Sequence, residues 1–546
     1  MHSRFFMRYK KTAHAGLLFF VCCLFLQPAA SAWAQAETTG KADFTTYSLE
    51  ELMNIELVSA AKKPQTAYES AAAVYVITQE DIRRSGAVNL PEALRMAPGI
   101  QVSRSDPGQF AVTSRGFLGE FANKLLVLID GRSVYSPLFS GTMWDYRDVL
   151  LENIERIEVI RGPGATLWGA NAVNGVINII TKHAKDVQGG MAVATVSNEE
   201  GYDGLRYGVK LKDNMYLSSY VKYMNYANVI NDKWIHEPRQ VNGGARLDWD
   251  MTDTDKLFVS AGYYDAKTAS SASRPVVIPP LEKIDVKGDA DLSGGHALAR
   301  WDHTFSATSN MQLQLFYDGG LQSARRSTPY KPAQDSPVLG KDLTRIDTYD
   351  FDFQHSFAAD SRNSIIWGVN ARYNRVKKRD FNIYFTLASE KETQRLYSAF
   401  VQDEIQLVPE RLSLTVGSKF EYNSSTQLEL QPSIRMLYTP SDTQSFWAAV
   451  SRAVRTPSVL ETDGFVPSAY LARGSLFPLS PPGVVEMQGS EDYNSEQLLA
   501  YEAGHRAQLA QNFSLDTALY YNVYSDLRSL EPASPQVKQG YFIIPV

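Results

Sequence analysis

From about residue 190 onward, the chain alternates between apolar and polar residues with a period of two. The clearest stretches are 244–251, 348–357 and 365–374; in the last, Trp367 falls on one face and Asn370 on the other. A period of two is the spacing of a β-strand whose two faces meet different surroundings. The pattern therefore predicts a long series of amphipathic strands. It fits a soluble sandwich, whose apolar face is the core, and equally a membrane barrel, whose apolar face meets lipid.

The connections between the predicted strands separate these two possibilities. They alternate between short and long, which is typical of an outer-membrane barrel with short periplasmic turns and longer extracellular loops. The short turns fall at 212–214, 252–256, 306–310, 358–363, 408–411, 439–443 and 507–512. The longer connections fall at 229–240, 266–294, 319–346, 375–394 and 456–496. Counting gives about fifteen strands. A content of 29 Tyr, 25 Phe and 8 Trp in a chain that is only 44% hydrophobic agrees with a barrel.

A glycine-rich stretch at 154–182, IERIEVIRGPGATLWGANAVNGVINIITK, stands before this region. It predicts two β-branched strands around a tight turn, where glycine supplies positive φ and Pro163 fixes φ. An ordinary buried βαβ-like segment with a glycine turn is an alternative. A phosphate-binding loop is disfavoured, because Ala170 and Asn171 stand where such a loop needs Lys and Ser or Thr.

Upstream, residues 74–77 predict a strand. Thr78 is the expected N-cap of a helix over 79–85 that Gly86 closes. Asn89 should cap a second helix with Pro91 in its first turn. Further on, Asp130-Gly131 signals a hairpin.

Several of these segments together resemble one family. The order VYVITQEDIRRSGAVNLPEALRMAPGIQV (74–102), SRGF (114–117), LLVLIDGRSVY (125–135) and 154–182 is similar to the plug of TonB-dependent outer-membrane receptors. Trp168 replaces the usual aromatic of one element, and Asn174 replaces a common glycine. Sequences of predicted barrel strands, such as YSAFVQDEIQL (397–407), also resemble those of the family. The resemblance implies a membrane β-barrel, of about 22 strands in the family, around an N-terminal α+β plug.

The resemblance also implies an activity, partners and site residues. The activity is TonB-dependent import of a scarce ligand, most commonly a ferric siderophore, with cobalamin or haem as alternatives. The partners are TonB with its inner-membrane motor, outer-membrane lipid and the ligand, for a monomer that binds no nucleic acid. The expected TonB box, which would add a strand to its partner, is Ile55, Glu56, Leu57, Val58, Ser59 and Ala60. The expected plug motif is Arg115, Gly116, Asp130, Gly131, Arg132, Glu155, Glu158, Arg161, Gly162, Pro163, Gly169, Asn171 and Gly175. The candidate ligand contacts, all in loops, are Arg104, Asp106, Gln109, Trp144, Tyr146, Arg325 and Arg326.

The expected domains are a signal peptide at 1–34, a periplasmic segment with the TonB box at 35–65, the plug at 66–188 and an incomplete barrel at 189–546. The leader has a basic start, an apolar run too short to span a bilayer, and an A-x-A site at 32–34; a membrane anchor is the alternative. Both cysteines, Cys22 and Cys23, lie in this leader. Removing it takes away four basic residues and leaves 50 basic against 60 acidic, a net charge of −10, which argues against nucleic acid.

No enzymatic pattern stands out, and we expect no catalytic residue, no bound metal and no cofactor beyond an iron chelate as ligand. A haem receptor should carry exposed histidines in its outer loops. Here only His236 lies well inside a predicted loop, with His296 at the edge of one, and this weakly disfavours haem as the ligand. The final Ile543-Ile544-Pro545-Val546 places proline where a strand needs a donor, so about seven closing strands are expected to be missing; a shorter barrel is the alternative. Rival functions are a signal transducer of the same family, a soluble β-rich binding protein, and a truncated remnant that transports nothing.

Overall fold

The computed structural model describes residues 56–59, 62–63, 65–66, 68–106, 108–119, 122–195, 200–226, 238–276, 282–327, 342–379, 385–510, 513–538 and 541–546. The chain divides into two compact units, Met1–Tyr47 and Ser48–Val546, and every described residue lies in the second. The expected signal peptide therefore lies outside the described residues, as do Ile55 and Ala60 of the expected TonB box. Within the described ranges, no helix is long and apolar enough to cross a membrane.

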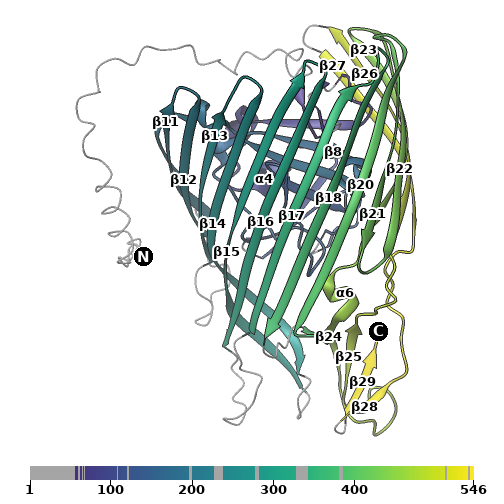
Figure 1. Ribbon diagram of the computed structural model, residues 1–546. Helices are drawn as coiled ribbons and strands as arrows, with labels where there is room; N and C mark the ends of the chain where they lie inside the picture. Colours follow the sequence, from purple (N-terminus) through teal and green to yellow (C-terminus); the bar gives the residue numbers. More distant parts are fainter. Residues whose placement is uncertain are drawn as a thin grey trace, which may run out of the picture. The chain divides into compact units, whose positions relative to one another are not determined.

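Fifteen antiparallel strands form one large sheet, as the strand count predicted (Figure 1). In sheet order they are β10 (Gly189–Ala194), β11 (Glu200–Lys212), β12 (Met215–Tyr226), β13 (Arg239–Asp250), β14 (Asp255–Val276), β15 (Glu282–Ser306), β16 (Ser309–Ser327), β17 (Asp342–Ala358), β18 (Asn363–Arg379), β20 (Lys391–Val408), β21 (Leu412–Asn423), β22 (Gln427–Ser441), β23 (Gln444–Arg455), β26 (Glu496–Ala510) and β27 (Phe513–Ser525). Among the residues that the structure describes, β10 and β27 stand at the two edges and each pairs with one neighbour only. We call this sheet the barrel sheet.

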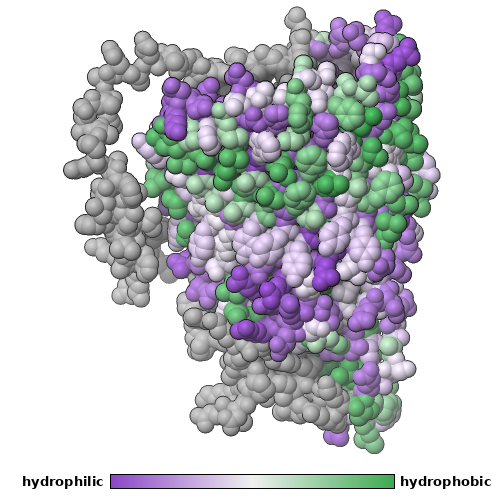
Figure 2. All heavy atoms as spheres, in the orientation of Figure 1, coloured by the Kyte–Doolittle hydropathy of each residue, from purple (hydrophilic) through white to green (hydrophobic). Residues whose placement is uncertain are grey.

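The two faces of the barrel sheet are opposite in character. On β17, Tyr349 and Phe351 are 50% and 38% exposed, whereas Asp350 between them is 7% exposed. The apolar side chains thus point outward and the polar ones inward, the reverse of a soluble sandwich and the arrangement of a membrane barrel. Figure 2 shows the outward residues as a hydrophobic band across the sheet, with hydrophilic residues toward the end where the long connections lie.

The strands reach further toward the long connections than the sequence predicted. β14 and β15 pair without interruption from Asp255↔His303 to Val276↔Glu282, although most of 266–294 was expected to be loop. In the same way β16 continues to Ser327 and β17 begins at Asp342. Backbone hydrogen bonds do not require apolar side chains, so the strands stay paired beyond the point where the apolar alternation stops. His296, expected at a loop edge, therefore lies inside β15.

The plug occupies the polar side of the barrel sheet and has its own small sheets. The main one, in the order β3-β8-β9-β6-β7, contains β3 (Ala73–Thr78), β6 (Leu125–Ile129), β7 (Arg132–Ser133), β8 (Ile154–Arg161) and β9 (Gly175–Thr181). Beside it are the pairs β1 (Glu56–Leu57) with β2 (Gln65–Thr66), and β4 (Ile100–Asp106) with β5 (Gln109–Ser114). The helices are α3 (Gln79–Ser85), α4 (Leu90–Leu94) and α5 (Ala165–Trp168), with 3-10 turns η2 (Leu151–Asn153) and η3 (Ala184–Val187). β8 and β9 confirm the two strands predicted around the glycine turn.

Local capping follows the sequence. Thr78 and Asp81 form a capping box at the start of α3, and Gly86 ends it in a left-handed conformation. Asn89 caps α4 through the backbone N–H of Glu92, with Pro91 in the first turn. The larger of two apolar clusters in the plug includes Ile77, Leu94, Val127, Ile157 and Ile177.

A separate five-stranded sheet, the outer sheet, lies at the end of the long connections. Its order is β19-β24-β25-β29-β28, from β19 (Thr386–Leu387), β24 (Gly464–Leu471), β25 (Gly483–Gln488), β28 (Gln536–Lys538) and β29 (Tyr541–Pro545). A short helix, α6 (Val459–Asp463), joins it to β23. Residues after Ser525, expected to start a long loop, thus contribute two strands, and Pro545 pairs with Glu486 at the end of β29, outside the barrel sheet.

Candidate functional site

Buried charged groups fix the expected plug motif to the barrel sheet. Arg115 Nη2 donates to the Glu502 carboxylate of β26 (2.6 Å) and to the carbonyl oxygen of Arg161 (2.9 Å). Gly162, at φ +120°, passes so close that a Cβ would lie 2.4 Å from Glu502 Oε1. The turn after β8 therefore needs glycine both for its backbone and for the space that Glu502 occupies.

A second buried group gathers around the β6–β7 turn. The Asp130 carboxylate accepts hydrogen bonds from the backbone N–H (2.8 Å) and hydroxyl (2.9 Å) of Thr181, which ties the turn to the end of β9. Arg132 pairs with Asp318 of β16, and Arg147 binds the same carboxylate through two hydrogen bonds of 2.6 and 2.8 Å. Two cations thus share the Asp318 carboxylate, and the Asp130 carboxylate also acts on Arg132.

The glycine turn itself contacts β22 and the end of β23 in the barrel sheet. Asn171, at φ +76°, donates its backbone N–H to the carbonyl of Val454 (2.8 Å) and accepts from the backbone of Thr456 (3.1 Å). The Pro163 carbonyl accepts from Arg435 (2.9 Å). Of the other expected motif residues, Gly116, Gly131 and Gly169 adopt positive φ, Gly175 packs against the Ile160 carbonyl, and Glu155 pairs with Arg156 at the surface.

The described part of the expected TonB box is docked into the plug. Leu57 is fully buried among plug residues, and the backbone N–H groups of Val58 and Ser59 donate to the Glu158 carboxylate (3.1 and 2.8 Å). Trp168 Nε1 donates to the Ser59 carbonyl (2.8 Å). A partner strand could pair with this segment only after it leaves the plug.

Two adjoining cavities lie over the part of the plug that faces the long connections, and we call them the outer cavities. Both are lined by Ser133, Tyr135, Pro137 and Thr348. One extends to Arg372, Asn374, Arg395, Ser424 and Ser458, and the other to Tyr146, Arg147, Tyr264, Asp318 and Gln322. Burial raises the pKa of the Tyr135 phenol, so this group is a neutral donor at physiological pH. Arg372 pairs with Asp350 (2.7 Å), whereas no ion pair within the described residues holds the exposed Arg395.

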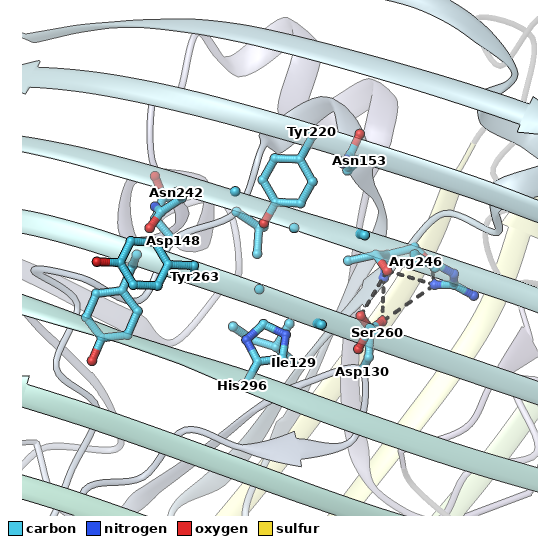
Figure 3. Close-up of a pocket in the computed structure, with 18 of the residues that line it drawn as sticks. Ile129, Asp130, Asp148, Asn153, Tyr220, Asn242, Arg246, Ser260, Tyr263 and His296 are labelled. Atoms are coloured by element: carbon cyan, nitrogen blue, oxygen red, sulfur yellow. Dashed lines mark hydrogen bonds and ion pairs between the residues drawn. The ribbon is translucent and has the colours of Figure 1, made fainter. Parts of the chain in front are cut away.

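A further cavity of about 80 Å³, the inner cavity, lies deeper between plug and wall (Figure 3). Its plug side carries Ile129, Asp130, Arg147, Asp148 and Lys182, and its wall carries Ser218, Tyr220, Asn242, Gly244, Ser260, Gly262 and His296. Burial lowers the pKa of Lys182. Among the described residues, no group of three or more His, Cys, Asp or Glu side chains is placed to hold a metal ion.

The expected ligand contacts are not brought together. Tyr146 lines an outer cavity, but Trp144 is 6% exposed in the plug core and lines neither of them. Arg104 and Gln109 lie on the β4–β5 hairpin, away from both outer cavities. Arg104 pairs there with Glu200 of β11 (3.4 Å). The side chains of Asp106, Arg325 and Arg326 lie outside the described residues.

Sequence reasoning missed the wall residues of all three cavities. Tyr264, His296, Asp318 and Arg372 occupy inward positions of alternating strands, which were expected to be polar and were not considered as ligand contacts. Alternation alone could have assigned them to the inward face. The strand register was needed to show which of them share a level.

The comparisons with known proteins fit this architecture. A family model for the TonB-dependent receptor plug domain matches residues 66–176, and a TonB-dependent receptor-like β-barrel model matches residues 198–543. The chain belongs to the TonB-dependent receptors. Solved receptors of similar fold include a mutant of the ferric enterobactin receptor PfeA of Pseudomonas aeruginosa, with a TM-score of 0.69 and 16% identity over 90% of this chain and 77% of that one. The siderophore receptor PirA of Acinetobacter baumannii gives a TM-score of 0.66 and 17% identity over 91% and 77%.

Curated TonB-dependent receptors match over shorter spans. The vitamin B12 transporter BtuB of Vibrio cholerae is 36% identical over 133 residues, which are 24% of this chain and 21% of the transporter. The ferric enterobactin receptor of Pseudomonas aeruginosa is 23% identical over 479 residues, 73% of this chain and 60% of that receptor. This TonB-dependent receptor chain thus spans between about a fifth and three fifths of the curated relatives' lengths.

Proposed function

We propose that the protein takes up an anionic iron chelate of the siderophore type across the bacterial outer membrane. The observation that carries the proposal is the pair of outer cavities over the plug. Arg147, Arg372 and Arg395 line them against a single lining carboxylate, Asp318. An excess of guanidinium groups among hydroxyl and amide groups suits a negatively charged chelate rich in oxygen atoms. The fold shared with solved siderophore receptors supports the same ligand class.

Cobalamin is the second candidate, because the vitamin B12 transporter has the highest identity among the relatives described above. That likeness covers a quarter of the chain, and a largely neutral corrinoid would offer no charged partner to Arg395, which forms no ion pair within the described residues. We therefore rank it below an anionic chelate. Energy for uptake would come from TonB acting on the segment that contains residues 55–60, since its docked part is continuous with the plug.

The test measures binding and uptake of ferric enterobactin, an anionic catecholate chelate, by the full chain in cells that lack other receptors for it. The Arg395→Ala substitution should weaken binding of ferric enterobactin by about 10- to 100-fold, the usual cost of losing a hydrogen bond to a charged group. The matched control is Arg411→Ala, an exposed arginine in the turn between β20 and β21 at the opposite end.

Tight binding of cyanocobalamin with none of the ferric chelate would replace the proposed ligand class with the second candidate. Equal losses in the two arginine variants would remove Arg395 from the site. Failure of the unmodified chain to bind either compound would overturn the proposal.

A further inference from the structure

The strand register orders two of the cavities along one wall. Asn242, Tyr264, Gly294 and Gly320 are successive partners on β13 to β16 and form one inward-facing row. The outer cavity that contains Arg147 extends from this row toward the long connections, past Leu292, Gln322 and Thr344. The inner cavity extends from it toward the short turns, past Ser218, Arg246 and Ser260. The two cavities are therefore consecutive, with this row between them.

A pair of stacked tyrosines occupies the boundary. Tyr146 of the plug stacks on Tyr264 of β14 with ring centroids 4.8 Å apart and an interplanar angle of 19°. Both residues line both cavities. The wall is shaped for Tyr264, since a Cβ on Gly294 or Gly320 would come within 2.5 or 2.6 Å of its hydroxyl.

The two tyrosines make few contacts with each other, and Arg147 is the residue that holds them together. Neither hydroxyl group has a hydrogen-bond partner within the described ranges, so the direct contact between the two residues is only the ring stack. The Arg147 guanidinium lies over both rings, 5.0 and 5.7 Å from their centroids, and is held by Asp318. Its Nε is buried without a partner. An anion in the outer cavity would compete with Asp318 for this guanidinium.

The inner cavity is suited to polar contents. Its wall row runs Tyr220, Gly244, Gly262, His296, and the rings of Tyr220 and His296 lean over the two glycines. In the part of the chain that the structure describes, the side chains of Tyr220, Asn242, Ser260 and His296 have no hydrogen-bond partner. Figure 3 shows these four side chains around the hollow. A cavity of this size holds several water molecules, and its unpartnered donors and acceptors can replace water around a polar ligand.

We propose that the Tyr146–Tyr264 stack is a gate between the ligand-binding outer cavity and the inner cavity, which is the first part of the ligand's path past the plug along β12 to β15. An anionic group opens the gate by drawing Arg147 away from Asp318. The proposal rests on the proposed function for the identity of what passes, but the barrier itself can be tested without ligand.

The first experiment measures access to the inner cavity. In full-length protein carrying Cys22→Ser and Cys23→Ser, a Ser260→Cys thiol is labelled from outside the cell with a small, charged methanethiosulfonate. Adding Tyr146→Ala should speed labelling by about tenfold. Phe117→Ala is the matched control, because Phe117 also contacts a barrel tyrosine, Tyr524, with centroids 4.8 Å apart. A Leu479→Cys thiol, on an 88% exposed side chain, should label equally in every background and reports the amount of receptor at the cell surface.

An unchanged rate in the Tyr146 variant, or an equal increase in the Phe117 variant, would overturn the gate. The second experiment bridges Tyr146→Cys to Tyr264→Cys with a reducible bifunctional methanethiosulfonate. Binding of ferric enterobactin should persist while uptake stops and returns on reduction, whereas a bridge from Phe117→Cys to Tyr524→Cys should leave uptake intact. If both bridges stop uptake, the plug moves as a whole and the local path is wrong. If the unbridged chain takes up nothing, the proposed function fails while the labelling result still decides the gate.

Discussion

At the scale of single residues, the plug motif is a set of contacts with the barrel as much as a folding signal. Arg115, Gly162 and Glu502 form one unit in which a buried guanidinium pairs with a buried carboxylate. Such a pair adds little to the free energy of unfolding compared with apolar packing, but removing one partner leaves an uncompensated buried charge. The glycine next to it is required because the carboxylate fills the volume that a side chain would take.

Gly162→Ala tests that requirement. The added Cβ would collide with the Glu502 carboxylate and would sit at φ +120°, so we expect a loss of about 1–3 kcal/mol of stability. Gly86→Ala is the control, since Gly86 also has positive φ (+72°) but nothing lies within 4 Å of the added atom. Thermal unfolding of the purified receptor in detergent should show the larger decrease for Gly162. Equal decreases in the two variants would mean that only backbone strain matters.

At the scale of elements, the first described strand is both part of the plug and the expected point of attachment for TonB. β1 contributes Leu57 to the plug, and the two backbone N–H groups after it are bound by Glu158. A strand held in this way cannot offer its edge to a partner. Release of the segment from Glu158 and Trp168 is therefore the step that would have to precede pairing.

Glu158→Gln should loosen this segment. The side-chain amide introduced by the substitution keeps one acceptor oxygen but lacks the charge that strengthens both hydrogen bonds, and the ion pair with Arg156 (2.9 Å) is lost as well. In the background without Cys22 and Cys23, a Leu57→Cys thiol should react with a maleimide about tenfold faster in the Glu158→Gln variant. Glu155→Gln, which removes a surface carboxylate from the same strand, should leave the rate unchanged. No acceleration in the Glu158 variant would show that the hydrogen bonds to Glu158 do not hold the segment in place.

At the scale of the whole molecule, the barrel sheet presents apolar side chains outward and surrounds a polar contact zone with the plug. The long connections continue as paired strands and carry the outer sheet, and the cavities and the proposed gate lie between plug and wall at different depths. This arrangement defines an orientation in the membrane, with the short turns at one end and the outer sheet at the other.

Thiol labelling on intact cells tests this orientation. Leu479→Cys, between β24 and β25, should react with a membrane-impermeant maleimide. Asp213→Cys, in the fully exposed turn between β11 and β12, should react only after the outer membrane is permeabilised. Labelling of Asp213→Cys on intact cells would reverse the orientation, and labelling of neither position before permeabilisation would place the protein away from the outer membrane.

The sequence by itself determined the amphipathic strands, their number, the helix caps of the plug and the two strands around Gly162. These follow from local chemistry, because strand alternation, N-capping side chains and positive-φ glycines act over a few residues. Only the tertiary structure decided which residues meet. Tyr146 and Tyr264, or Arg147 and Asp318, are more than a hundred residues apart, and their contact depends on the register of successive strands and on how the plug is seated. It also decided that Trp144 is buried in the core and that the long connections remain strands, because backbone pairing and packing over distance leave no local mark in the sequence.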